Sequence, residues 1–328
     1  WHSRSSNREA ETRDRLESMD NQKNKLVSVA AVVLTLPLKM PQLPERGTTV
    51  LGQAQRPGVG EAAEVMIAAA RQAVPVINMS CLGTGPNSTQ ARQVLRNANI
   101  QIKAMEVVGE IGMKIQMIET GGYYASVLTT GVEVDISALE LTKVAMHPGD
   151  LVYISAGDLI HSSYRSALGQ WLPTIAAEVT VVMAATPRIS QIDPHYVSQV
   201  LPYVDVLTCN EHESRFLPGS VGHLSCGYVA EKLPESAWAV ERVGSHGAKL
   251  IDAHRETMIP SLNVKAVDTL GVGAAQTGVL LAELVKGRKR REALARANIA
   301  GALAATKEGN DACPDEVEIS RYLDKIVF

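Results

Sequence analysis

Apolar runs and amphipathic stretches alternate along most of this chain. Continuous apolar runs rich in β-branched residues predict buried strands over 26–36, 74–83, 149–159, 177–188 and 205–210. Stretches with apolar residues at helical spacing predict helices over 61–73, 87–100, 189–204, 211–217, 274–286 and 289–307. Strands that alternate with helices in this way are typical of a mostly parallel sheet with helices on both faces. The pattern therefore predicts an α/β fold.

Three further segments interrupt this alternation. Residues 112–131 contain two short strands joined at Gly121 and Gly122, which is a hairpin signal. Residues 237–260 contain a strand, a glycine turn and a second hairpin. Residues 43–60 are rich in turn-forming residues and suit an irregular β segment. We therefore expect a small β addition beside the main sheet.

Length and charge narrow the class of protein. The 328 residues are 45% hydrophobic, which is enough for one large α/β domain or for two smaller domains. The formal net charge is -3 and no basic stripe stands out, so nucleic acid is not an expected partner. No apolar run reaches the roughly 18 residues that a membrane span needs, so no membrane partner is expected either.

The cysteines give no sign of a metal or disulfide framework. Cys81, Cys209, Cys226 and Cys313 lie far apart and none forms a C-x-x-C pair. Reduced thiols of this kind are typical of the cytoplasm, so we expect a cytoplasmic protein.

Residues 1–25 differ from the rest of the chain. They are polar and charged, with too little apolar content to fold alone. They have no apolar core of a secretory signal, and they carry several acids, which a transit peptide would avoid. We interpret them as a disordered tail or an added leader, with Met19 as a candidate native start, and residues 26–328 as the folded domain.

The stretch VDTLGVGAAQTG, residues 267–278, passes from a strand end through a glycine turn into a helix. A helix N-terminus presents unpaired N–H groups and a partial positive charge. Gly271 and Gly273 let the backbone approach an anion because no Cβ intervenes. Gly271, Val272 and Gly273 therefore form a candidate anion hole. An ordinary tight strand-to-helix turn is the alternative, since short glycine motifs are weak evidence.

This stretch resembles D-T-x-G-A-G-D-x-F-x-G, the C-terminal signature of the ribokinase-like (PfkB) carbohydrate kinases. The matching residues are Asp268, Thr269, Gly271, Gly273 and Gly278. Upstream, Asn210 and Glu213 resemble the family's N-x-x-E, and Gly244 and Gly247 resemble its G-x-x-G turn. The resemblance covers about residues 26–325, is strongest in the C-terminal half, and is closest to bacterial sugar kinases.

The family resemblance implies a fold and an activity. The fold is a ribokinase-like three-layer α/β sandwich with a mostly parallel central sheet and a small β lid from about residues 35–60 and 100–130. The activity is phosphoryl transfer from ATP, with Mg²⁺, to a hydroxyl of a small sugar or nucleoside. Members of the family often dimerise through the lid, so the resemblance also implies a homodimer.

The resemblance also assigns roles to individual residues. On the ATP side it places Asn210, Glu213, Gly244, Gly247, Asp268, Thr269 and Asn298, with Glu213 organising Mg²⁺ through water. Simpler structural roles are the alternatives. Asn210 and Glu213 suit a helix cap and a first-turn acid, Asp268 and Thr269 suit a strand-end turn, and Asn298 suits a hydrogen bond between helices.

The chain departs from the family pattern at the chemical centre. Ala274 occupies the position of the aspartate that takes the proton from the sugar hydroxyl. Loss of a general base typically costs roughly 10²–10⁴ in rate. Asp158, at a strand end, is the nearest candidate for a replacement acid, and Arg188 is a candidate to face the cleft.

The substrate side is altered as well. Thr35 stands where the family's first strand ends in a sugar-binding aspartate. The family's G-G-x-x-x-N becomes VGEAAE, in which Val59 replaces a glycine, Gly60 is kept and Glu64 replaces the sugar-binding asparagine. Glu64 can still accept hydrogen bonds from hydroxyl groups. The identity of the sugar does not follow from the sequence, because the residues that would read its hydroxyls are the ones that changed.

Two functions from different classes remain. The first is an ATP-dependent sugar kinase that is impaired because Ala274 supplies no base. The alternative is a catalytically dead relative that binds nucleotide or acts as a scaffold. A Rossmann-type dehydrogenase is not favoured, because its G-x-G-x-x-G should follow the first strand, whereas this glycine turn lies near the C-terminus.

Overall fold

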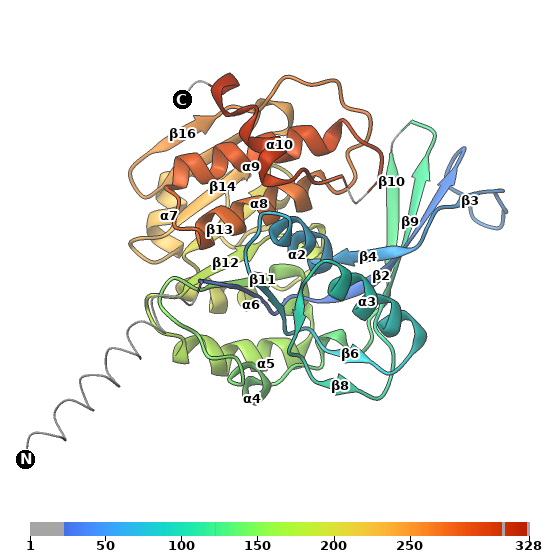
Figure 1. The fold of residues 1–328 in the computed structure, drawn as a ribbon, viewed down its shortest axis with the longest axis horizontal. Helices are drawn as coiled ribbons and strands as arrows, with labels where there is room; N and C mark the ends of the chain where they lie inside the picture. Colours follow the sequence, from blue (N-terminus) through green and yellow to red (C-terminus); the bar gives the residue numbers. More distant parts are fainter. Residues whose placement is uncertain (1–22, 122, 310–311, 327–328) are drawn as a thin grey trace, which may run out of the picture.

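The computed structural model describes residues 23–121, 123–309 and 312–326. The predicted tail over residues 1–25 lies almost entirely outside them. Figure 1 shows an α/β body from which a second, smaller sheet projects on one side. Within the described ranges, no helix combines the length and the apolar character needed to cross a membrane.

The central sheet has nine strands in the order β16-β15-β14-β13-β12-β11-β1-β5-β7. Their bounds are β1 (Leu26–Ser28), β5 (Val76–Asn78), β7 (Gln101–Ile102), β11 (Leu151–Ser155), β12 (Thr180–Ala184), β13 (Val206–Asn210), β14 (Trp238–Arg242), β15 (Ala248–Asp252) and β16 (Glu256–Ile259). The strands from β14 to β7 pair in parallel, whereas β15 is antiparallel to β14 and β16. The predicted mostly parallel sheet is confirmed.

The apolar run 26–36 forms two strands, so the prediction of a single strand is wrong. β1 ends after three residues, and β2 (Val32–Met40) continues into the second sheet. Between them Val29 and Ala31 are buried. The N–H of Ala31 donates to the Asp158 carboxylate at 2.8 Å instead of to a neighbouring strand. The link is as apolar as the strands, so the hydrophobic pattern does not reveal the break.

The second sheet has the strand order β10-β9-β2-β3, and β4 also pairs with β2. Its other strands are β3 (Gln53–Ala54), β4 (Gly58–Glu61), β9 (Met113–Glu119) and β10 (Tyr124–Leu128), and a separate short pair consists of β6 (Leu82–Gly83) and β8 (Glu106–Val107). β9 and β10 are the hairpin predicted over 112–131, and they pair in antiparallel register. The second sheet is thus built largely from the segments expected to form a lid, 35–60 and 100–130.

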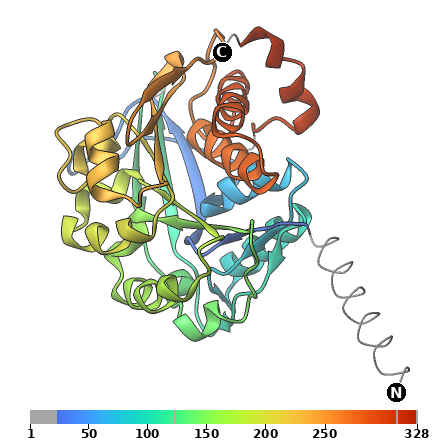
Figure 2. The same cartoon turned by 90° about the vertical axis from the view of Figure 1, so that its left-hand side faces the viewer.

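Helices cover both faces of the central sheet and produce two hydrophobic cores (Figure 2). The helices on the first face are α2 (Ala62–Ala70), α3 (Pro86–Asn97), α8 (Val272–Val285), α9 (Arg290–Ala305) and α10 (Glu316–Ser320). Those on the second face are α4 (Ala138–Leu141), α5 (Ser162–Trp171), α6 (Pro194–Val200) and α7 (Cys226–Lys232). Within β1, Leu26 belongs to the first core and Val27 to the second, as alternation along a strand requires. The three-layer arrangement is confirmed.

The helix predictions differ in how closely they match. The stretches 61–73, 87–100, 274–286 and 289–307 correspond to α2, α3, α8 and α9. The stretch 189–204 is divided into the end of a 3-10 helix, Pro187–Gln191, the seven-residue α6 and a second 3-10 helix, Leu201–Tyr203. Prolines stand at the start of each piece. The stretch 211–217 contains a short 3-10 helix, Glu213–Phe216, instead of an α-helix.

Gly278 allows α8 and α2 to pack unusually closely. A Cβ at this position would lie 2.4 Å from the carbonyl oxygen of Val65 and 2.5 Å from the Cβ of Ala68. Any larger residue would therefore push the two helices apart. The close contact holds the N-terminal ends of both helices at the same cavity.

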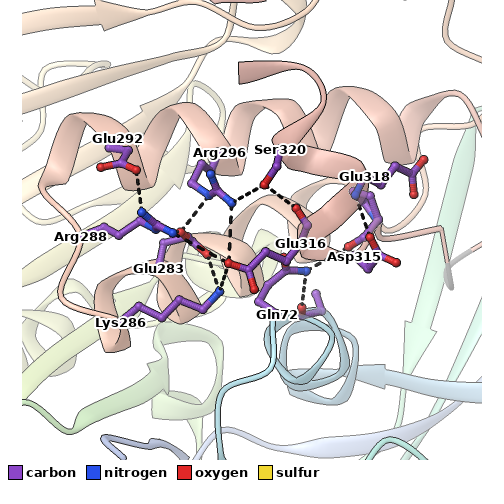
Figure 3. A network of polar contacts seen from close by, with 12 residues as sticks. Gln72, Glu283, Lys286, Arg288, Glu292, Arg296, Asp315, Glu316, Glu318 and Ser320 are labelled. Carbon is purple, nitrogen blue, oxygen red and sulfur yellow. Dashed lines mark hydrogen bonds and ion pairs between the residues drawn. The ribbon is translucent and has the colours of Figure 1, made fainter. Parts of the chain in front are cut away.

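A buried ionic network fastens α10 to α8 and α9 (Figure 3). Glu283 of α8 has no exposed surface, and it pairs with Lys286 at 3.1 Å, with Arg288, and with Arg296 at 2.9 Å. Glu316 of α10 pairs with Lys286 at 2.9 Å. The network lies at the C-terminal end of α8, away from the glycine turn, so it supports the helix without lining the cavity.

Candidate active site

A cavity of about 870 Å³ lies where the parallel strands end and the second sheet begins. Its wall includes the last residues of four central strands, Ser155, Ala184, Asn210 and Arg242, together with Lys114 of β9. Ligands of open α/β sheets bind beyond the carboxyl ends of the strands. The position of the cavity therefore marks it as the candidate active site.

Most of the site residues named from the sequence meet at this cavity. Those that line it are Glu64, Asn210, Glu213, Gly244, Gly247, Thr269, Gly271, Val272, Gly273, Ala274 and Asn298. Asp158 also lines it, whereas Thr35, Gly60, Arg188 and Asp268 do not.

The glycine turn forms the start of α8. Gly271 is the N-cap, with a left-handed φ of 73° that favours glycine. The first helical hydrogen bond runs from the N–H of Ala275 to the carbonyl of Gly271, at 2.8 Å. The N–H groups of Val272, Gly273 and Ala274 precede that bond, so they have no partner within the helix. Nothing lies within 4 Å of a Cβ built on Gly273, so the turn offers an open set of backbone donors and no acid.

Asp268 holds this turn in place from outside the cavity. One carboxylate oxygen accepts the N–H of Leu270 at 2.9 Å, and the other accepts the N–H of Gly309 at 3.0 Å. The N–H of Asp268 itself donates to the carbonyl of Ala305 at the end of α9. This is a turn role, the alternative to direct ligand contact. The predicted strand end is wrong, however, because β16 ends at Ile259 and residues 260–271 form no strand before α8.

Asn210 and Glu213 cap the short helix after β13 in a reciprocal way. The side-chain oxygen of Asn210 accepts the N–H of Glu213 at 2.8 Å, and the Glu213 carboxylate accepts the N–H of Asn210 at 2.9 Å. The same carboxylate oxygen receives Arg242 at 3.0 Å. Burial raises the pKa of Glu213, although Arg242 opposes the shift. Arg242 was not identified from the sequence, where it is an ordinary strand residue before the G-x-x-G turn.

Asn298 is buried between α9, α8 and the chain after β16. Its side-chain oxygen accepts from Gln276 at 2.6 Å, and its amide donates to the carbonyls of Ile259 at 2.8 Å and Pro260 at 3.2 Å. The bond to Gln276 is the helix–helix hydrogen bond given as its alternative role. Asn298 nevertheless forms part of the cavity wall.

Four charged side chains form a chain of ion pairs at the other end of the cavity. Lys114 of β9 contacts Glu61 at 3.0 Å, Glu61 lies 3.7 Å from Arg188, and Arg188 donates to Asp158 at 2.6 Å. Burial acts to raise the pKa of Glu61, but Lys114 and Arg188 outweigh it and the pKa falls below its ordinary value. Burial raises the pKa of Asp158 despite Arg188. Glu61 and Lys114 were not named from the sequence, because nothing in it links strand 113–119 to residue 61.

The backbone is strained at Glu61. Its φ of 56° is unusual for a residue with a side chain, and it lies at the junction of β4 and α2. Strained conformations persist only where the surrounding structure fixes them, and they cluster at functional sites. Here the two ion pairs of Glu61 fix the junction.

Thr35 and Gly60 lie behind the cavity wall. Thr35 is 2% exposed, and its hydroxyl has no hydrogen-bond partner among the described residues. A Cβ on Gly60 would lie 2.1 Å from that hydroxyl, so glycine is required for the two strands to fit. Glu64, in the first turn of α2, is the member of this predicted trio that lines the cavity.

A family model and individual relatives both match this chain to carbohydrate kinases. The family model described as pfkB family carbohydrate kinase matches residues 23–317. An ATP-dependent ribose-1-phosphate kinase of Halopiger xanaduensis is 25% identical over 92% of this chain and 98% of its own length. The uncharacterized sugar kinase YegV of Escherichia coli is 24% identical over 89% of this chain and 91% of its own.

Solved structures show the same fold. A putative ribokinase II from E. coli, in its apo form, superposes with a TM-score of 0.77 at 19% identity, covering 92% of this chain and 99% of that chain. Ribokinase from Giardia lamblia superposes with a TM-score of 0.76 at 16% identity, covering 93% and 99%. The ribokinase-like fold expected from the sequence is confirmed.

Proposed function

Because this chain belongs to the pfkB family of carbohydrate kinases, we propose that it binds ATP and a small neutral sugar or nucleoside in the cavity. ATP supplies the transferable γ-phosphoryl group. The observation that carries this proposal is the arrangement of one cavity with an open helix N-terminus at one end and an acceptor-rich charged cluster at the other. Ala274 lies in the cavity wall at the first turn of that helix.

The nucleotide is proposed to occupy the end formed by α8, α9 and the loops after β14 and β16. Gly271–Gly273 present backbone donors to the transferred phosphate. Leu262, Val264, Ala302 and Ala305 provide an apolar wall for a purine ring. Gly244 also lines this end of the cavity, and the space beside its Cα is open, because a Cβ there would meet nothing within 4 Å.

The acceptor is proposed to lie against Glu61, Glu64 and Lys114. The two cations of the cluster, Lys114 and Arg188, are balanced by Glu61 and Asp158, and Glu64 adds a further acid. This end of the cavity therefore carries no surplus positive charge. It suits a neutral, hydroxyl-rich acceptor better than the phosphorylated sugar in the name of the Halopiger relative.

The chemical step is proposed to be slow, because Ala274 cannot accept a proton. Asp158 is not a ready substitute, since it is 1% exposed and its two oxygens already accept from Arg188 and the N–H of Ala31. Phosphoryl transfer depends mainly on positioning and charge neutralisation. Positioning alone should therefore leave a low but measurable turnover.

The test is ADP release from ATP by the full chain, with a panel of neutral sugars, nucleosides and sugar phosphates. We expect slow, sugar-dependent release with neutral acceptors. Calorimetric titration with ADP and ATP separates binding from chemistry. Binding without any acceptor-dependent turnover would favour the second candidate, a non-catalytic nucleotide-binding relative, which the alanine at position 274 supports. If the chain shows neither nucleotide binding nor acceptor-dependent turnover, the proposed function is refuted.

We further propose that two copies associate through the second sheet. Tyr123 and the β10 residue Val127 are 77% and 53% exposed, although both are large and hydrophobic, and alternation along the strand places them on the face opposite to Tyr124, which lines the cavity. Exposed apolar residues that gather in one place mark interaction sites. Light scattering of the full chain, compared with a Tyr123→Ser/Val127→Ser variant, should show a dimer for the former and a monomer for the latter.

A further inference from the structure

Arg242 lines the cavity and contacts the second turn of α8. Its guanidinium lies 3.5 Å from the hydroxyl of Thr277, which is three residues after Ala274 on α8. The N-terminal end of a helix carries a partial positive charge and repels cations. The one acidic side chain that pairs with Arg242 among the described residues is Glu213. A single carboxylate thus faces two positive features, and a bound anion would balance the remainder.

The guanidinium is held rigidly while part of it stays available. Nη1 donates to Thr208 at 3.0 Å as well as to Thr277, and Nη2 donates to Glu213 at 3.0 Å. Nε and the second hydrogen of Nη2 have no partner in the part of the chain that the structure describes. The side chain lines the cavity and is 16% exposed. A planar guanidinium held in this way is suited to phosphate recognition.

Glu213 is poorly placed to serve a divalent cation. Its side chain is 4% exposed, and the same oxygen accepts from Arg242 and from the N–H of Asn210. Ala274 supplies no oxygen nearby. Across the described ranges, no group of three or more His, Cys, Asp or Glu side chains could hold a metal ion. The acids of the cavity wall beside Asn210 are Glu211 and Glu213, so the donor set does not fit Mg²⁺ held by a cluster of three or more protein side chains.

We propose that Arg242, together with the N-terminus of α8, binds the polyphosphate of the nucleotide directly, so that nucleotide binding does not depend on a divalent cation. The proposal rests on the nucleotide-binding part of the proposed function. It assigns Glu213 the role of counter-ion to Arg242 in place of the metal-organising role that its motif suggests.

The experiment is calorimetric titration of the full chain with ADP, and separately with inorganic tripolyphosphate, in Mg²⁺ and in EDTA. We expect the two conditions to give similar affinities for ADP. Arg242→Gln should weaken binding by about 10- to 100-fold, the value of a charge-assisted hydrogen bond. Arg290→Gln is the matched control, because Arg290 contacts Trp238 and the carbonyl of Ser236 outside the cavity, and it should leave binding unchanged.

Glu213→Gln separates the two roles of the carboxylate. Glutamine can still accept the N–H of Asn210 but no longer neutralises Arg242. If Glu213 is a counter-ion, ADP should bind more tightly, by roughly the few-fold value of a partly exposed ion pair. If Glu213 organises Mg²⁺, the variant should bind ADP more weakly, and only the titration in Mg²⁺ should change.

Each outcome bears on the inference in a defined way. ADP binding that requires Mg²⁺ overturns it and leaves the proposed function intact. Tripolyphosphate binding in EDTA without ADP binding would show a phosphate site at Arg242 but would refute the nucleotide binding on which the inference rests. If neither ADP nor tripolyphosphate binds, both the inference and the proposed function are refuted. If Arg242→Gln unfolds, as thermal melting would show, the double variant Arg242→Gln/Glu213→Gln removes the unpaired buried charge and should show the same loss of binding.

Discussion

Restoring a carboxylate with Ala274→Asp is the most direct perturbation of the chemical step. The residue is half-buried in the first turn of α8 and lines the cavity beside the open backbone donors. A positioned general base contributes about 10²–10⁴ in rate. The introduced carboxylate would stand near Arg242 and the positive helix end, both of which lower a carboxyl pKa. A weaker base contributes less, so we expect a gain near the lower limit, about 10².

The assay is steady-state ADP release with the neutral sugar that the acceptor panel identifies. Ala274→Asn is the control, because its side chain has nearly the same shape but accepts no proton at neutral pH. An acid in the first turn of a helix contributes about 0.3–1 kcal/mol of stability, so the melting temperature of Ala274→Asp should not fall. Equal turnover by the Asp and Asn variants, with ADP still bound, would refute the reasoning that a missing base limits the reaction.

Three further predictions concern stability, each measured by urea unfolding. Glu283→Ala should cost about 3–5 kcal/mol, because it leaves the buried Arg296 with Glu316, at 3.8 Å, as its one acidic partner among the described residues; a loss below 1 kcal/mol would show that the network contributes little. Gly278→Ala should cost about 1–3 kcal/mol through the clash with Val65, and an unchanged midpoint would contradict the close packing. Glu61, whose folded pKa lies below the ordinary 4.5, should stabilise the protein above that pH. The wild-type advantage over Glu61→Gln should shrink as pH falls below 4.5, and a pH-independent advantage would exclude its pairing with Lys114 as the cause.

Local patterns predict the body of the fold because its elements are regular. α8 and α9 are 14 and 16 residues long and rich in Ala and Leu despite Gly273, Gly278 and Gly301, and most central strands are apolar runs. The run 26–36 shows the limit of this reasoning. Its residues remain buried while the chain passes from one sheet to the next, so burial stays constant where topology changes. Periodicity reports burial, and it does not report which sheet a strand joins.

The proposed phosphate end of the site follows from one contiguous motif, whose residues lie together at the cavity. Gly271, Gly273 and Ala274 are neighbours in sequence and in space. The acceptor end joins Glu61 to Lys114 across more than fifty residues, and the pairing depends on how the second sheet meets the body. Arg242 could not be predicted from the sequence for a related reason. Its contacts come from three separate elements, namely β13, the short 3-10 helix after it, and α8. Long-range charge pairs of this kind follow from the tertiary fold alone.

We expect substitutions at Ala274 and Arg242 to be energetically coupled. An acid at 274 would lie about one helical turn from Thr277, which Arg242 already contacts. It would therefore pair with Arg242 and compete with bound phosphate. Ala274→Asp should weaken ADP binding in the wild-type background, and it should have little further effect when Arg242→Gln is already present. A double-mutant cycle on ADP affinity measures this coupling, which we expect at about 0.5–3 kcal/mol. Additive effects of the two substitutions would show that the side chains do not meet, and the loss of the base would then be independent of the arginine.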